Sequence, residues 1–238
     1  IDLFRLAAAL LIITIHTSPL ADLSDTADFI LTRIAARVAV PFFFVTSGLF
    51  LISRYHDQPA KLWAFVKKTA LIYAAAAIFY IPVNLYNGYF KMENLLPNLI
   101  KDIMFDGTLY HLWYLPASVI GGGIAWGLVK KLDYKKATAA AAALYLVGLF
   151  GDSYYGWIGE IPACSGFYAL IFQVSDYTRN GIFFAPLFFV MGGFIADHNK
   201  TMYRQSRSGE TVSAESASGK AVLMVCFVLM FALMLVEG

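Results

Sequence analysis

The sequence predicts an all-α membrane protein, a polytopic bundle of about seven transmembrane helices. Hydrophobic residues make up 59% of the 238 residues and charged residues only 14%, a balance beyond that of soluble domains. Long apolar runs recur along the whole chain, so the first run is a span rather than a removable signal peptide. The net charge of +2 is dispersed along the sequence and argues against a nucleic-acid partner.

Seven apolar runs approach the roughly 20 residues that a helix needs to cross a bilayer. They lie at residues 3–20, 38–53, 69–87, 111–129, 137–151, 182–196 and 221–237. The fifth and sixth are short for a full crossing, so we expect each to extend into the adjoining loop or to pack inside the bundle. The run at 161–174 is shorter still and is typical of an interfacial or re-entrant helix.

Basic residues alternate between the predicted loops. The loops at 54–68, 130–136 and 197–220 hold four Lys and Arg each, whereas the three intervening loops together hold five. Because Lys and Arg accumulate on the cytoplasmic side, this alternation places the amino end and the three basic loops in the cytoplasm. The chain begins at Ile1 and stops at Gly238 as the seventh run ends, so we expect more protein to follow.

Two ionisable residues, Arg5 and His16, interrupt the first run. Eleven residues of α-helix turn by about 1,100°, which places both on one face, about 16 Å apart along the axis. The plain interpretations are a snorkelling anchor for Arg5 and a hydrogen bond to a neighbouring helix for His16. Ionisable groups at that depth usually face the bundle interior. We therefore expect His16 to line a polar cavity, within reach of Ser47, His111 and Arg179, with Arg5 at its cytoplasmic end.

The Arg-x10-His spacing resembles the signature of the acyltransferase 3 family of multi-span membrane proteins, in which that histidine is taken as catalytic. VPFFFVTSGLFL in the second run is similar to a family stretch that ends in Ser-Gly and an aromatic, although Leu49 replaces the aromatic. YHLWYLPA at 110–117 is similar to another family stretch. The resemblance implies an acyltransferase-3 type bundle over residues 1–238. In an O-acyltransferase, His16 would be the general base, and Arg5 would lie between a cytoplasmic acyl-CoA donor and an external hydroxyl acceptor.

A closer resemblance covers nearly the whole chain. IHTSPL, LTRIAARVAVPFFF and SDYTRNGIFFAPLFF are similar to the membrane domain of the VanT-type membrane-bound serine racemases of vancomycin-resistant bacteria. The resemblance implies a domain of the bacterial plasma membrane that takes up L-serine for a fused cytoplasmic racemase domain, which uses pyridoxal phosphate and is absent from this sequence. Uptake, acyl transfer and passive anchoring all stay open, and so does a homodimer. No metal or cofactor is expected in this chain itself, which lacks HExxH, Walker and GxGxxG motifs.

We expect an amino-acid substrate to meet polar residues from several runs. The candidates are His16, Ser47, His111, Trp113, Tyr114, Asp176, Arg179 and Asn180. A zwitterion needs a cation for its carboxylate and an anion for its ammonium, which Arg179 and Asp176 would supply. The plain alternatives are interfacial anchoring for the aromatic residues, a solvated Asp176–Arg179 pair, and close helix packing at Ser47 and Gly48.

Overall fold

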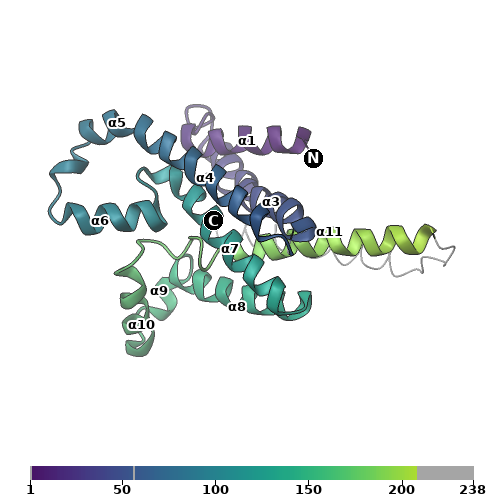
Figure 1. Ribbon diagram of the computed structural model, residues 1–238. Helices are drawn as coiled ribbons and strands as arrows, with labels where there is room; N and C mark the ends of the chain where they lie inside the picture. Colours follow the sequence, from purple (N-terminus) through teal and green to yellow (C-terminus); the bar gives the residue numbers. More distant parts are fainter. Residues whose placement is uncertain (1, 56, 208–238) are drawn as a thin grey trace. The chain divides into compact units, whose positions relative to one another are not determined.

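The computed structural model describes residues 2–55 and 57–207. These residues are mostly helical and contain no strand, which confirms the predicted all-α class. The longer helices are α1 (Asp2–Thr17), α3 (Ala39–Tyr55), α4 (Pro59–Phe79), α7 (Tyr114–Lys131), α8 (Tyr134–Gly151), α10 (Pro162–Phe172) and α11 (Ala185–Arg207) (Figure 1). The shorter elements are α2 (Asp25–Phe29), the π-helix η1 (Ile30–Ala35), the 3-10 helix η2 (Ala36–Val38), α5 (Ile81–Tyr86), η3 (Tyr89–Lys91), α6 (Leu95–Lys101), the π-helix η4 (Asp102–Asp106), η5 (Tyr110–Trp113) and α9 (Tyr155–Ile158).

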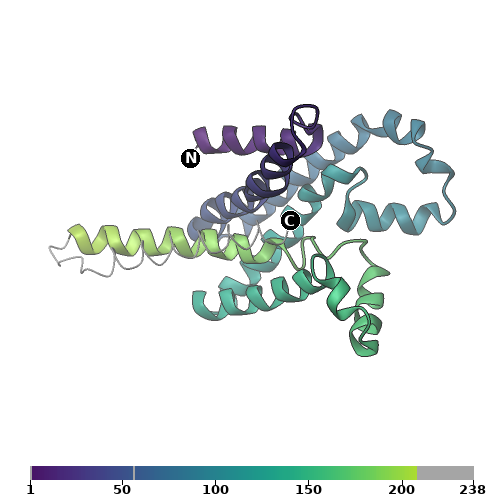
Figure 2. The ribbon, with the colours of Figure 1, turned by 180° about the vertical axis from the view of Figure 1, so that it is seen from behind.

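The described residues form two compact units. The first comprises residues up to Phe43 and from Ile195 onward, and the second comprises Phe44–Phe194. In the first unit the chain reverses after α1, so that α1 packs against η1 and η2 (Figure 2). The buried carboxylate of Asp28 stabilises this reversal of the chain, because it accepts a hydrogen bond from the Leu20 backbone N–H at 3.0 Å.

Within the described residues, three segments are long and apolar enough to cross a membrane: Asp25–Ile52, Pro59–Phe79 and Tyr110–Lys131. Two further apolar helical segments, Pro162–Phe172 and Ala185–His198, are shorter. This composition fits a helical membrane bundle, whereas the count of about seven crossings stays a prediction. The run predicted at 221–237 lies outside the described residues.

Three predicted boundaries, one of the second run and two of the third, differ from the helix ends in the structure. The helical segment that contains the second run begins at Asp25 rather than at residue 38, although its α-helix α3 begins at Ala39. Ser24 caps the start of this segment by accepting a hydrogen bond from the Ala27 N–H. The third is predicted at 69–87, but α4 begins at Pro59, which suits the first turn of a helix. It ends at Phe79 because Pro82 has no N–H to donate to the carbonyl four residues earlier. Charged residues near these boundaries lie on the helices and do not mark their ends.

The fifth and sixth runs do extend into the adjoining loops. Helix α8 begins at Tyr134, within the predicted basic loop, where the Asp133 side chain caps it by accepting from the Lys136 N–H at 2.9 Å. Helix α11 continues to Arg207, well beyond the predicted end at residue 196. The expectation of longer helices is confirmed for both.

The second unit is built on close helix contacts. Helices α4 and α7 pack against each other in antiparallel directions (Figure 1). One contact joins Phe65 to Gly122, where an added Cβ would lie 3.2 Å from the ring, and Tyr80 meets the ring of His111 at a centroid distance of 4.9 Å. Helices α3 and α11 meet backbone to backbone at Gly48, where an added Cβ would overlap the backbone carbonyl group of Phe189. Close packing at Gly48 is therefore confirmed.

Candidate functional site

The loop between α10 and α11 is the polar centre of the second unit. Its residues Ser175, Thr178 and Asn180 are almost completely buried, at 1%, 0% and 1% exposure. Buried polar groups are costly unless they are hydrogen-bonded, and each of these is. The Thr178 hydroxyl donates to the Gly148 carbonyl at 2.6 Å, which ties the loop to α8.

Asn180 holds the loop together from within. Its side-chain amide donates to the Tyr177 carbonyl at 2.8 Å and to the Ser175 hydroxyl at 3.2 Å. Its side-chain oxygen accepts from the N–H groups of Ile182 and Phe183 at 2.9 and 3.2 Å. All these contacts are internal, so the structure gives Asn180 a part in fixing the loop, while its contact with a substrate stays a prediction.

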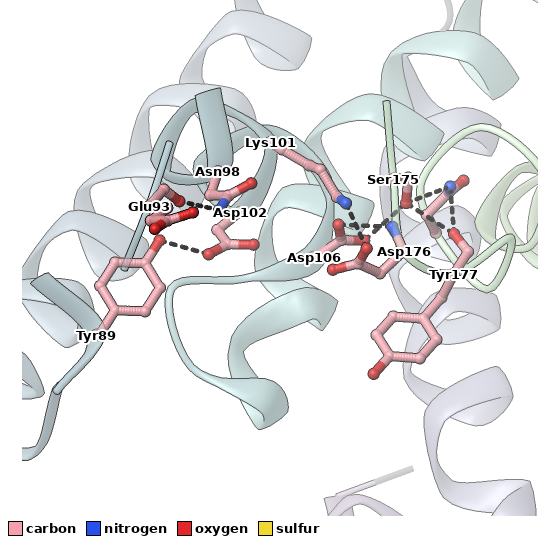
Figure 3. Close-up of polar contacts among 10 residues, drawn as sticks. Tyr89, Glu93, Asn98, Lys101, Asp102, Asp106, Ser175, Asp176 and Tyr177 are labelled. Carbon is pink, nitrogen blue, oxygen red and sulfur yellow. Dashed lines mark hydrogen bonds and ion pairs between the residues drawn. The ribbon is translucent and has the colours of Figure 1, made fainter. Parts of the chain in front are cut away.

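Asp106 joins this loop to the π-helix η4 (Figure 3). Its buried carboxylate lies 2.7 Å from the Ser175 hydroxyl oxygen and accepts from the Asp176 backbone N–H at 2.8 Å. Nearby, the Asp102 carboxylate accepts a hydrogen bond from the Tyr89 hydroxyl, and Lys101 forms an ion pair with Asp176. The segment 101–106 is therefore held to the loop by the hydrogen bonds of Asp106 and by the ion pair of Lys101.

Three carboxylates gather in this cluster, which we call the acidic cluster: Asp102, Asp106 and Asp176, with oxygens within 4.8 Å of one another. Burial raises the pKa of Asp106, against the opposing effect of the Ser175 and Asp176 hydrogen bonds. Burial likewise raises the pKa of Asp102, although the Tyr89 hydrogen bond lowers it. The Lys101 ammonium supplies one positive charge against these three carboxyl groups. The cluster is thus suited to holding a proton.

Arg179 and Trp113 are the predicted substrate residues that the structure brings together. The Arg179 guanidinium carbon lies 5.5 Å from the centre of the Trp113 ring, within the range of a cation–π contact. Trp113 and Tyr114 both pack against the buried Phe44 ring of α3, with centroid distances of 6.4 and 4.8 Å. The Trp113 ring, which packs against Phe44, therefore supports the guanidinium.

The other predicted residues of this unit have different partners. Asp176 pairs with Lys101 rather than with Arg179, which shows that the suggested solvated Asp176–Arg179 pair is wrong. His111 is half-buried and contacts the Tyr80 ring, and Ser47 is half-buried in α3. Their contact with a substrate stays a prediction.

Arg5 and His16 belong to α1 in the first unit. The uninterrupted helix places them on one face, as predicted from their spacing. Arg5 is half-buried and pairs with Asp2 at 3.2 Å, while the His16 side chain, in the last turn, is exposed. Ser47, His111 and Arg179 belong to the other unit, so the predicted meeting of His16 with them stays a prediction.

The residues of this site that were not predicted from the sequence include Lys101, Asp102, Asp106, Ser175 and Thr178. The available signal was the pair of acids at 102 and 106, four residues apart in the apolar segment LIKDIMFDG. Such spacing puts both carboxyl groups on one side of a helix. The second half of the cluster comes from a loop 70 residues further along, which no local pattern connects to it.

Comparison with known protein families matches residues 1–237 to the acyltransferase 3 family, described as an acyltransferase domain. An amino-acid racemase of Enterococcus faecalis is 67% identical over 197 residues, which cover 83% of this chain and 28% of the relative. A second amino-acid racemase of that organism is 40% identical over 199 residues, covering 82% and 28%. A serine/alanine racemase of Enterococcus gallinarum is 37% identical over 197 residues, covering 81% and 28%. The chain thus spans little more than a quarter of these relatives, and no solved structure matches it.

Proposed function

This chain belongs to the acyltransferase 3 family, and we propose that it takes up L-serine from outside the cell for a racemase domain in the same protein. The identity to proteins named amino-acid racemase and serine/alanine racemase supports this proposal. The racemase reaction, with its pyridoxal phosphate, is assigned to the part of those relatives that this chain does not cover. Production of D-serine in this way would serve vancomycin resistance.

The main structural support for the proposal is the cation–π contact between the Arg179 guanidinium and the Trp113 ring. A guanidinium on an aromatic face keeps its N–H donors in its own plane, where a carboxylate binds through two parallel hydrogen bonds. Asp176, three residues earlier, is exposed and carries the opposite charge needed beside a substrate ammonium, which would compete with the Lys101 ammonium for this carboxylate. The loop therefore offers both charges that an amino-acid zwitterion requires.

Replacement of Arg179 by glutamine is expected to weaken L-serine binding by about tenfold to a hundredfold, because a charge-assisted pair of hydrogen bonds is lost. Lysine at this position should restore only part of the affinity, since it presents a point charge instead of a planar fork. Equilibrium binding of labelled L-serine to the purified protein measures both effects. The exposed Lys91, changed to glutamine, provides the control. Equal binding of L-serine by the wild type and the Arg179→Gln variant would contradict the assignment of Arg179 to the substrate carboxylate.

Acyl transfer is a second candidate function, favoured by the family's description as an acyltransferase domain. His16 would act as general base on a hydroxyl group, with Arg5 on the same helix face toward the acyl-CoA donor. In that case, the His16→Ala variant is expected to lose label transfer from labelled acyl-CoA by at least about a hundredfold. Label transfer that does not depend on His16 would exclude this role. A domain that only anchors the racemase would show neither serine uptake nor transfer.

A further inference from the structure

The ion pair between Lys101 and Asp176 occupies the carboxylate that the proposed function assigns to a substrate ammonium. Lys101 is the last residue of α6, and its side chain is only 18% exposed, whereas that of Asp176 is 56% exposed. The carboxylate is therefore the accessible partner of the pair, and the lysine side chain is mostly covered by protein.

The two charged residues of the loop are held in different ways. The Arg179 guanidinium lies against the Trp113 ring, which has no formal charge, so this contact does not neutralise the cation. Asp176, in contrast, already has a cation beside it. An arriving amino acid would thus find the end of the loop that binds its carboxylate ready and the end that binds its ammonium filled.

The lysine side chain carries the same chemical group as the substrate. A lysine and an amino acid each present an ammonium, with three donors around one positive charge. Two such groups at one carboxylate repel each other, so the binding of one disfavours the binding of the other. The Lys101 ammonium and a substrate ammonium are therefore competitors for Asp176.

Asp102 and Asp106, the other members of the acidic cluster, can receive the displaced lysine. Carboxylate oxygens of the three residues lie within 4.8 Å of one another, and Figure 3 shows Lys101 reaching toward this group. Burial raises the pKa of both Asp102 and Asp106, and the nearby Lys101 ammonium opposes this effect. A short shift of the flexible lysine side chain therefore moves its charge from Asp176 to its neighbours.

We propose that Lys101 is a resident counter-ion of Asp176, which a substrate ammonium displaces on binding and which displaces the substrate again on release. The inference rests on the proposed function, which places an amino acid at Arg179 and Asp176. It adds a residue that limits the affinity for this amino acid, as a transport site requires in order to let its substrate leave.

Equilibrium binding of two ligands to the purified full-length protein tests the exchange. L-serine carries the ammonium, and L-glycerate carries a hydroxyl group in its place. Lys101→Gln is expected to bind L-serine about twofold to fivefold more tightly than the wild type, because a competing ion pair at a partly exposed carboxylate is lost. Its affinity for L-glycerate, measured by competition with labelled L-serine, should not rise. The Lys91→Gln variant should bind both ligands as the wild type does.

Lys101→Arg tests the same exchange in the opposite direction. Arginine keeps the positive charge but pairs with a carboxylate through two parallel hydrogen bonds, so it is a stronger competitor than lysine. This variant is expected to bind L-serine more weakly than the wild type, with little change for L-glycerate. It also decides the question if Lys101→Gln does not fold, since equal or tighter binding of L-serine by Lys101→Arg would overturn the inference.

The remaining outcomes separate the exchange from the proposed function. Unchanged or weaker binding of L-serine by folded Lys101→Gln would overturn the inference, and weaker binding of both ligands would assign Lys101 to the substrate carboxylate instead. Tighter binding of both ligands would overturn it as well, because L-glycerate has no ammonium to compete. If the wild type binds no L-serine, the proposed function fails and the inference fails with it.

Discussion

Replacement of Gly192 by valine is expected to destabilise the second unit by about 3 kcal/mol or more, enough to lose most of the folded protein. A Cβ at this position would overlap the Val45 carbonyl oxygen and would lie 2.7 Å from the Leu49 backbone nitrogen. Both obstacles are backbone atoms of α3, so no side-chain rotation relieves the overlap. Size-exclusion chromatography and thermal unfolding in detergent measure the loss.

Gly127 of α7 offers a matched control for this substitution. It also lies within a helix, but an added Cβ would meet nothing within 4 Å. Gly127→Val is therefore expected to change stability by no more than about 1 kcal/mol. Comparable losses in the two variants would show that the contact between α3 and α11 is not as close as described.

Replacement of Asp106 has the second largest expected effect. Alanine removes the charge together with the acceptors facing Ser175 and Asp176, whereas asparagine removes the charge and retains an oxygen for the Asp176 N–H. The introduced side-chain amide would donate to the Ser175 hydroxyl oxygen while that hydroxyl donates to the Tyr177 carbonyl. We expect Asp106→Ala to be less stable than Asp106→Asn by about 1–3 kcal/mol, measured from Tm in detergent. Equal stability of the two variants would show that these hydrogen bonds do not hold the loop.

The stability of the wild type is expected to rise as pH falls from neutral toward the ordinary range of carboxyl groups. Burial raises the pKa of Asp106 in the folded state, so between its ordinary and raised values the folded protein binds more protons than the unfolded protein. Stability from this group is complete below the ordinary pKa and is lost as pH rises through the raised value. Thermal unfolding across this range should show a smaller rise for Asp106→Asn than for the wild type. If the stability of the wild type and of Asp106→Asn changed equally with pH, groups other than Asp106 would be responsible for the change.

The membrane character and the helical class could be predicted because apolar runs of bilayer length need no tertiary information. The ends of α4 and of the segment that begins at Asp25 could not be predicted from charge, because Lys and Arg side chains reach polar surroundings while their backbone remains helical. Proline indicates these helix ends better than charge does, because Pro59 begins α4 and Pro82 follows its end. Helix boundaries in this chain depend more on backbone hydrogen bonding than on side-chain charge.

The site was only partly predictable for a related reason. The order of the spans predicts Arg179 and Trp113 at one end of the bundle, and the structure brings them together. The contact between Asp106 and Ser175 joins residues 69 positions apart and depends on a π-helical turn that has no sequence signature. Whether His16 faces a polar cavity stays a prediction, because it requires the placement of one unit against the other.

Uptake of labelled L-serine into sealed membrane vesicles tests the central claim most directly. Vesicles that contain the wild-type protein are expected to accumulate L-serine above the level of empty vesicles, and the Arg179→Gln variant should reduce this accumulation in proportion to its loss of binding. The Lys91→Gln variant should behave as the wild type. Accumulation no greater than that of empty vesicles, together with no measurable binding of L-serine, would contradict the proposed function.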